Sequence, residues 1–183
     1  VRNSTVKPSG LPDARLMLEA PGLDTEVLYR QVEAWFTVHG IGSDRLVWLG
    51  RKPEQQYVLY HEVDIALDPF PCNGGTTSFD TLWMGVPLVT LAGQTFVSRM
   101  GASLLSNVGL PELIAQTEDQ YIAIAKGLAA DVQELNRLRQ GLRARMERSA
   151  LLDKPRFTHA MEEAFLEMWR VYAQGSTPLR SAP

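Results

Sequence analysis

Short apolar runs alternate with amphipathic stretches as far as about residue 115. The runs are bounded by Gly, Pro or Asp, which is typical of buried strands. The stretches between them carry apolar residues three and four positions apart, which predicts helices. The predicted strands cover residues 14–20, 45–49, 64–68, 87–91 and 112–115, and the predicted helices cover 25–39, 54–62, 76–84 and 95–107. This alternation predicts an α/β fold with a Rossmann-like parallel sheet and right-handed crossovers.

The rest of the chain is predicted to be helical. Thr117 with Gln120 forms a capping-box pattern that opens one helix, and Asp153 with Pro155 opens the last one. Two apolar stripes follow helical spacing, Val132, Leu135, Leu138, Leu142 and Met146 in the first, and Phe157, Met161, Phe165, Met168 and Tyr172 in the second. We therefore expect a truncated or disordered end over residues 1–10, a ligand-binding domain over 11–150, a C-terminal helix over 151–174 packed on that domain, and a tail over 175–183.

Composition and charge exclude several classes of protein. The 183 residues are 45% hydrophobic and have a formal net charge of −3, so one buried core is expected and no basic surface marks a nucleic-acid binder. The single cysteine, Cys72, rules out an internal disulfide framework and suits a reducing compartment. The chain shows neither an apolar run of membrane length nor the apolar region of a signal peptide at its start. We expect a cytoplasmic piece of a longer protein, with no nucleic-acid or membrane partner.

The loop after Asp68 contains the most informative residues, because ligands of parallel sheets bind beyond the carboxyl ends of the strands. Gly74–Gly75 permit a positive φ and leave no side chains between the backbone N–H groups and a ligand. Thr76–Thr77 then open a helix, whose free N–H groups and partial positive charge favour an anion. Asp80 follows one turn later and could accept hydrogen bonds from a sugar hydroxyl. A diphosphate followed by a ribose would fit this arrangement.

The same residues also fit a simpler interpretation. The Gly-Gly-Thr-Thr sequence could be a tight turn with a helix N-cap, and Asp80 could compensate the helix dipole. Neither a Walker lysine motif nor a G-x-G-x-x-G pattern is present, so P-loop and ordinary dinucleotide sites lack their signatures. The three histidines, His39, His61 and His159, do not have the spacing of metal ligands, and no metal site is predicted.

Residues 64–91, DIALDPFPCNGGTTSFDTLWMGVPLVTL, resemble the C-terminal catalytic half of the O-GlcNAc transferase/SPINDLY family, glycosyltransferase family 41. Residues 93–99 and 157–172 are also similar to that family, and the resemblance runs from about residue 11 to residue 172. Enzymes of the family have a GT-B fold, in which two Rossmann-like domains hold the nucleotide sugar mainly on the C-terminal one. The resemblance therefore implies that this chain is the C-terminal domain of a GT-B glycosyltransferase, and that residues 11–150 bind the nucleotide sugar.

The resemblance also implies a role for each residue of the donor site. The loop of Cys72, Asn73, Gly74, Gly75, Thr76 and Thr77 would hold the diphosphate, and Asp80 the ribose hydroxyls. The base would lie against Arg51, Lys52 and Pro53, near Gln56. Thr76 and Thr77 would support the leaving diphosphate during catalysis. Lys7 is either the counterpart of the family's diphosphate-binding lysine or part of a flexible end.

The implied reaction is metal-independent, inverting transfer of GlcNAc from UDP-GlcNAc to Ser or Thr hydroxyls of proteins, with no cofactor. Its partners would be an acceptor protein and the N-terminal catalytic half and TPR repeats of the same polypeptide. Gln56 stands where many members have His, and Gly75 stands where the animal enzymes have His. These departures leave open a GDP-fucose donor, a UDP-glucose donor or a non-catalytic nucleotide-binding scaffold. We expect this chain alone to bind nucleotide but to transfer little or no sugar.

Overall fold

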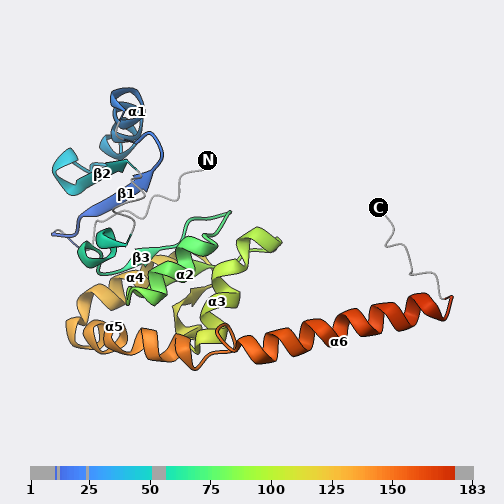
Figure 1. Ribbon diagram of the computed structural model, residues 1–183. Helices are drawn as coiled ribbons and strands as arrows, with labels where there is room; N and C mark the ends of the chain where they lie inside the picture. Colours follow the sequence, from blue (N-terminus) through green and yellow to red (C-terminus); the bar gives the residue numbers. More distant parts are fainter. Residues whose placement is uncertain (1–10, 12, 24, 51–56, 176–183) are drawn as a thin grey trace.

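The computed structural model describes residues 11, 13–23, 25–50 and 57–175 (Figure 1). The strands are β1 (Leu16–Ala20), β2 (Leu46–Gly50), β3 (Ala66–Leu67), β4 (Leu88–Leu91) and β5 (Ile114–Ala115). They pair in parallel, which confirms the predicted α/β class. The strands form two small sheets, β1-β2 and β3-β4-β5, where the sequence predicted one.

The β1-β2 sheet is joined by a helical crossover, α1 (Glu26–Thr37). Its register pairs Leu16 with Leu46 and Ala20 with Gly50. The ring of Tyr29 on α1 meets the ring of Trp48 on β2 edge to face, with centroids 5.1 Å apart, so the helix packs on this sheet. In Figure 1 this unit forms the blue upper part of the molecule.

Four helices surround the β3-β4-β5 sheet: α2 (Thr76–Trp83), α3 (Met100–Val108), α4 (Glu118–Ala130) and α5 (Val132–Glu147). Short 3-10 turns lie at Ser43–Arg45 (η1), Val58–Glu62 (η3), Phe96–Ser98 (η4) and Pro111–Leu113 (η5). The helix expected over 95–107 is therefore divided. Ser98 accepts a hydrogen bond from the Thr95 N–H at 3.0 Å and closes η4 before α3 begins.

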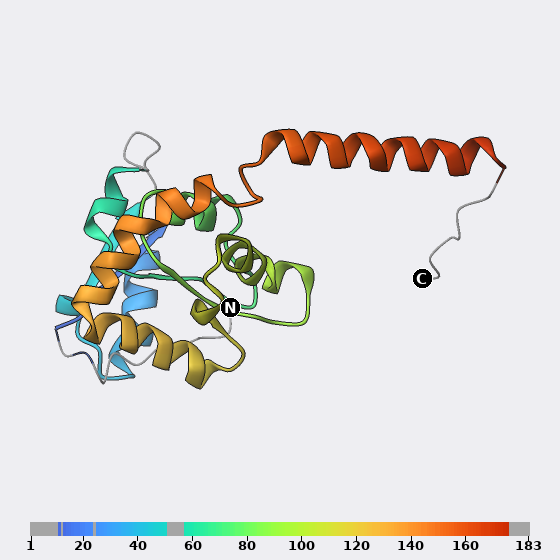
Figure 2. The same cartoon turned by 90° about the horizontal axis from the view of Figure 1, so that it is seen from below.

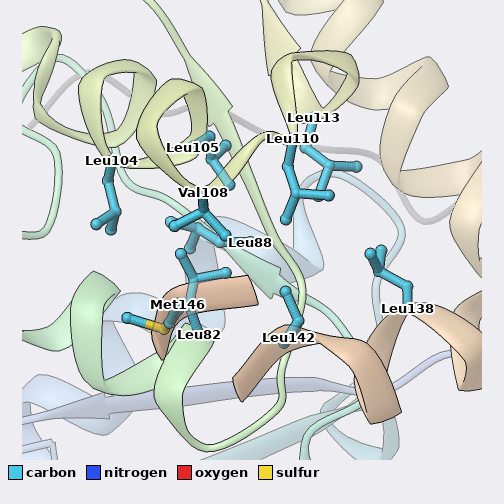
Figure 3. Packing of buried hydrophobic residues seen from close by; sticks show 10 residues of the cluster. All are labelled: Leu82, Leu88, Leu104, Leu105, Val108, Leu110, Leu113, Leu138, Leu142 and Met146. Carbon is cyan, nitrogen blue, oxygen red and sulfur yellow. The ribbon is translucent and has the colours of Figure 1, made fainter. Parts of the chain in front are cut away.

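The hydrophobic core lies between α2, α3, α5 and the β3-β4-β5 sheet (Figure 3). Its buried side chains are Leu82, Leu88, Leu104, Leu105, Val108, Leu110, Leu113, Leu138, Leu142 and Met146. The first predicted stripe is confirmed except at Val132, which begins α5 and is 61% exposed. Each fully buried side chain of this kind stabilises the fold by about 1.5–3 kcal/mol. The core therefore joins α2, α3 and α5 to the β3-β4-β5 sheet.

Arginines of α5 reach carbonyl oxygens at the ends of other elements. Arg143 donates to the carbonyl of Trp83, the last residue of α2, and its guanidinium lies 4.8 Å from the centre of the Trp83 ring. Arg145 donates to the carbonyl of Gly109, which follows α3. A cation at a helix C-terminus interacts favourably with the helix dipole. These two side chains therefore attach α5 to the ends of α2 and α3.

The last helix, α6 (Lys154–Ala173), begins as predicted but does not pack as predicted. The Asp153 side chain accepts a hydrogen bond from the Arg156 N–H, which caps the helix. Residues 153–175 are all exposed, and α6 leads away from the rest of the molecule (Figure 2). Its apolar stripe, with Phe157 67% and Phe165 59% exposed, finds no apolar surface to cover among the described residues. Within those residues no helix combines the length and apolar character that crossing a bilayer requires.

Candidate functional site

The candidate site lies at the carboxyl ends of β3 and β4. Asp68 follows β3 and still pairs with β4, because its N–H donates to the carbonyl of Val89 at 2.9 Å. The chain then leaves the sheet, and Asn73 ties the loop to its neighbours. The Asn73 N–H donates to the carbonyl of Val97, its Nδ2 donates to the carbonyl of Pro69, and its Oδ1 accepts from the Gly101 N–H. Asn73 is 5% exposed, so its side chain holds the loop from inside.

Gly74 lies close to the first turn of α2. Its N–H donates to Asp68 Oδ1 at 2.8 Å. A Cβ at Gly74 would collide with Ser78 Oγ and lie 2.8 Å from Thr77 Oγ1. The positive φ that the sequence allowed for Gly74 and Gly75 is not used, because neither has one. Because Gly74 has no side chain, the loop backbone can lie close to the first turn of α2.

The N-terminus of α2 presents unpaired N–H groups next to this loop. The first amide to be paired is that of Phe79, which donates to the carbonyl of Gly75 at 3.2 Å. The N–H groups of Thr76 and Thr77 have no acceptor among the described residues, and both side chains are exposed. A helix N-terminus with free N–H groups and a partial positive charge is suited to a phosphate oxygen. The arrangement can therefore bind an anion without a metal ion.

Tyr60 of η3 brings the segment after β2 against α2. Its hydroxyl donates to the carbonyl of Thr77 at 3.4 Å. Burial raises the pKa of the Tyr60 hydroxyl, and the nearby carboxylates of Asp80 and Glu19 raise it further. The hydroxyl therefore stays protonated as a donor at neutral pH. Asp80 lies partly buried on α2, one turn after Thr77, as the sequence indicated.

Asp68 belongs to the candidate site but was not predicted from the sequence to be a site residue. Its side chain is 1% exposed. Burial raises the pKa of its carboxyl group, while hydrogen bonds from Thr90, Gly74 and Ser78 oppose that rise. The signal in the sequence was a carboxylate at the end of an apolar strand, six positions before Gly74. It was interpreted only as a strand boundary.

A cavity of about 390 Å³ lies beyond the carboxyl ends of β4 and β5. It is lined by Phe70 and Pro71, by residues 91–95 and Ser98, and by residues 116–118 at the start of α4. The loop residues Phe70 and Pro71 line this cavity, and the N-terminus of α2 follows the same loop. Both are at the sheet edge where parallel α/β folds bind ligands.

The structure brings together the predicted residues Cys72, Asn73, Gly74, Gly75, Thr76, Thr77 and Asp80 in one loop and the helix that follows it. Cys72 is exposed, and its thiol lies 3.9 Å from the carbonyl oxygen of Asn73. The predicted residues Lys7, Arg51, Lys52, Pro53 and Gln56 lie outside the described residues. Among the described residues, no cluster of three or more His, Cys, Asp or Glu side chains could hold a metal ion.

Comparison with known proteins finds relatives over most of the chain. The chain is 43% identical over 173 residues to SPINDLY of Arabidopsis thaliana, a probable UDP-N-acetylglucosamine–peptide N-acetylglucosaminyltransferase, covering 92% of this chain and 19% of the relative. It is 34% identical over 137 residues to the UDP-N-acetylglucosamine–peptide N-acetylglucosaminyltransferase of Caenorhabditis elegans, covering 74% of this chain and 12% of the relative. The chain therefore spans less than a fifth of the length of these relatives.

A solved structure of a mutant O-GlcNAc transferase from Thermobaculum terrenum superposes with a TM-score of 0.87 at 38% sequence identity. The match covers 93% of this chain and 33% of that chain. A family model described as glycosyl transferase family 41 matches residues 25–161, which include β2, the β3-β4-β5 sheet and the candidate loop. The chain belongs to glycosyltransferase family 41.

Proposed function

We propose that this chain is the donor-binding part of a protein O-linked glycosyltransferase that transfers GlcNAc from UDP-GlcNAc to Ser or Thr hydroxyls. The observation that carries the proposal is the pair of unpaired N–H groups of Thr76 and Thr77, placed beside a glycine loop. They are suited to a diphosphate. The named activity of the relatives supports UDP-GlcNAc as the nucleotide sugar that contains it.

In this proposal the acceptor hydroxyl attacks the anomeric carbon of the sugar, and the bond from that carbon to the diphosphate breaks with inversion. UDP leaves with the electron pair, and the N–H groups of Thr76 and Thr77 stabilise its negative charge. The acceptor proton passes to a base in the part of the polypeptide outside this chain. No metal ion or other cofactor takes part.

The remaining predicted residues complete the donor site in this proposal. Asp80 accepts hydrogen bonds from the ribose hydroxyls. Arg51, Lys52, Pro53 and Gln56 surround the base, and Lys7 adds a positive charge at the diphosphate. Cys72 and Asn73 shape the loop. Because Gly75 has no side chain, the donor could also be GDP-fucose or UDP-glucose, and the titration below distinguishes a uridine from a guanosine nucleotide.

The partners in this proposal are an acceptor protein and the rest of the same polypeptide, including an N-terminal Rossmann-like half and TPR repeats. The exposed stripe of α6 would be covered by that N-terminal half, since a stripe that contains Phe157 and Phe165 is costly to leave in water. The enzyme would act in the cytoplasm. The domain of residues 11–150 would bind donor, and α6 would join the two halves.

The test is calorimetric titration of UDP, and separately of GDP, into the purified chain. We expect UDP to bind, and binding to weaken when Thr76→Ala, Thr77→Ala and Asp80→Ala are combined, because this variant removes two hydroxyls and a carboxylate of the proposed site but keeps the N–H groups. Ser106→Ala, a hydroxyl removed from the exposed face of α3, is the matched control and should bind UDP as the unaltered chain does. Preference for GDP would move the proposal to a fucosyl donor. Binding of neither nucleotide would contradict the proposed donor site.

A further inference from the structure

The buried carboxylate of Asp68 connects the sheet to the candidate anion site. On the loop side, Asp68 Oδ1 accepts hydrogen bonds from the Gly74 N–H at 2.8 Å and from Ser78 Oγ at 3.2 Å. On the sheet side, Asp68 Oδ2 accepts from Thr90 Oγ1 on β4 at 2.7 Å. The backbone carbonyl of the same residue accepts from the Tyr121 hydroxyl on α4 at 2.9 Å. One residue thus fixes the loop and the first turn of α2 relative to β4 and α4.

The surroundings are shaped to admit this carboxylate. Gly101 of α3 faces it, and a Cβ at Gly101 would collide with Asp68 Oδ2 and Thr90 Oγ1. The approach of the α3 backbone leaves Asp68 1% exposed and Thr90 fully buried. Burying a carboxylate is unfavourable unless its oxygens are hydrogen-bonded. Its three bonds offset part of that penalty, and two of them go to the loop and the first turn of α2.

These bonds decide which N–H groups remain available to a ligand. The Gly74 N–H is used by Asp68, so Gly74 does not itself contribute a donor to the diphosphate. Ser78 is drawn toward the same oxygen, which orients the first turn of α2. The N–H groups of Thr76 and Thr77 lie between these two anchored points and have no acceptor among the described residues. A displaced loop would lose this orientation.

We propose that Asp68 is a positioning residue for donor binding: it holds Gly74 and Ser78 so that the Thr76 and Thr77 N–H groups face the diphosphate. This inference rests on the proposed function. Asp68 does not touch the donor and acts only through the loop. A side chain that keeps an oxygen at the place of Oδ1 therefore preserves binding, and one without that oxygen does not.

The experiment is UDP titration into the unaltered chain, Asp68→Asn, Asp68→Ala and Leu142→Ala, at a temperature where circular dichroism shows all four folded. Asp68→Asn keeps an acceptor for Gly74 and Ser78, so its Kd should stay within about threefold. Asp68→Ala should raise the Kd at least about tenfold, consistent with the loss of hydrogen bonds to a charged group. Leu142→Ala destabilises the core without touching the loop and should leave the Kd unchanged.

Should Asp68→Ala fail to fold, Ser78→Ala removes one loop-side bond and should still raise the Kd at least about threefold. The inference is overturned if the unaltered chain binds UDP and Asp68→Ala, or Ser78→Ala in its place, binds it equally well. It is also overturned if Leu142→Ala weakens binding as much, since the effect would then be one of stability. Failure of the unaltered chain to bind UDP or GDP would instead refute the proposed function, and this inference with it.

Discussion

Replacing Gly74 by Ala tests the assignment of that glycine to a lack of space. Because the φ of Gly74 is not positive, alanine can adopt its backbone conformation. The added Cβ would collide with Ser78 Oγ and lie 2.8 Å from Thr77 Oγ1. The Ser78 hydroxyl must therefore turn away from Asp68 and lose its 3.2 Å hydrogen bond.

The magnitude follows from that lost bond. A hydrogen bond to a charged group contributes about 1.5–3 kcal/mol, and removing a glycine from the unfolded chain returns about 0.4–1 kcal/mol. The free energy of unfolding should therefore fall by about 1–2 kcal/mol. For a chain of this length, that lowers Tm by about 2–8 °C. UDP binding should weaken by more than the loss of folding stability alone would cause, because the loop of the proposed site is itself displaced.

The assay is thermal and urea unfolding followed by circular dichroism, with UDP titration on the same samples. Gly141→Ala is the matched control, because a Cβ at Gly141 inside α5 meets no atom within 4 Å. That substitution should raise the free energy of unfolding by about 0.5–1 kcal/mol, the usual gain of alanine over glycine in a helix. If Gly74→Ala is as stable as Gly141→Ala and binds UDP normally, the steric account of the loop is wrong.

Three further variants and a change of pH test other parts of the structure. Gly101→Ala should lower the free energy of unfolding, measured in urea, by about 3 kcal/mol. The added Cβ would lie 2.8 Å from Thr90 Cβ, which cannot rotate away. If the variant is as stable as the unaltered chain, α3 does not pack against Thr90 in this way. Arg143→Ala should lower the free energy of unfolding by about 1 kcal/mol, because it removes the hydrogen bond to the Trp83 carbonyl and the contact with the Trp83 ring, and it should change the Trp fluorescence. The control Arg137→Ala breaks only an exposed ion pair with Glu134 and should not measurably change the free energy of unfolding. Phe165→Ser combined with Met168→Ser should change the free energy of unfolding of this chain by no more than about 0.5 kcal/mol. The same variant should associate more weakly with a separately expressed N-terminal half, whereas the control Glu163→Ser should associate as the unaltered chain does. Equal association of both variants would refute the docking of α6. Burial raises the folded-state pKa of Asp68 above its ordinary 3.8, so the folded state binds a proton at this carboxyl group more tightly than the unfolded state does. Lowering the pH from 7 toward 4 should therefore stabilise the unaltered chain relative to Asp68→Asn in urea unfolding. A difference between the two that does not change with pH would contradict the raised pKa.

Features set by residues three or four positions apart could be predicted from the sequence. The Thr117 cap, which accepts from the Gln120 N–H, and the Asp153 cap, which accepts from the Arg156 N–H, are both present. Gly40 and Gly85 follow α1 and α2 and have the positive φ that is common for glycine at helix C-termini. The helical spacing also identified four of the five residues in the α5 stripe. In each case the partners are neighbours along the chain, so the sequence displays both of them.

Features that depend on distant residues could not be predicted in this way. The bond between Asp68 and Thr90 joins positions 22 apart, and the bond from Tyr121 to Asp68 joins positions 53 apart. No periodic pattern identifies such partners, so Asp68 was interpreted as a strand boundary and Gly74 as a turn residue. The α6 stripe shows the converse. Its helical spacing was correct, but spacing does not say whether the surface that covers an apolar face belongs to the same chain.

The described residues of the candidate site are held in place by other residues of this chain, whereas the groups proposed to activate the acceptor lie outside it. Gly74, Thr76 and Thr77 are held by Asp68, Ser78, Asn73 and Thr90, all within residues 68–101. In the proposed function, the described supports of the diphosphate part of the site therefore all lie within this chain. Acceptor activation, by contrast, is proposed for the rest of the polypeptide, to which α6 offers an uncovered apolar face. Nucleotide affinity and sugar transfer should for this reason be separable, with affinity retained by this chain and turnover restored only when the other half is present.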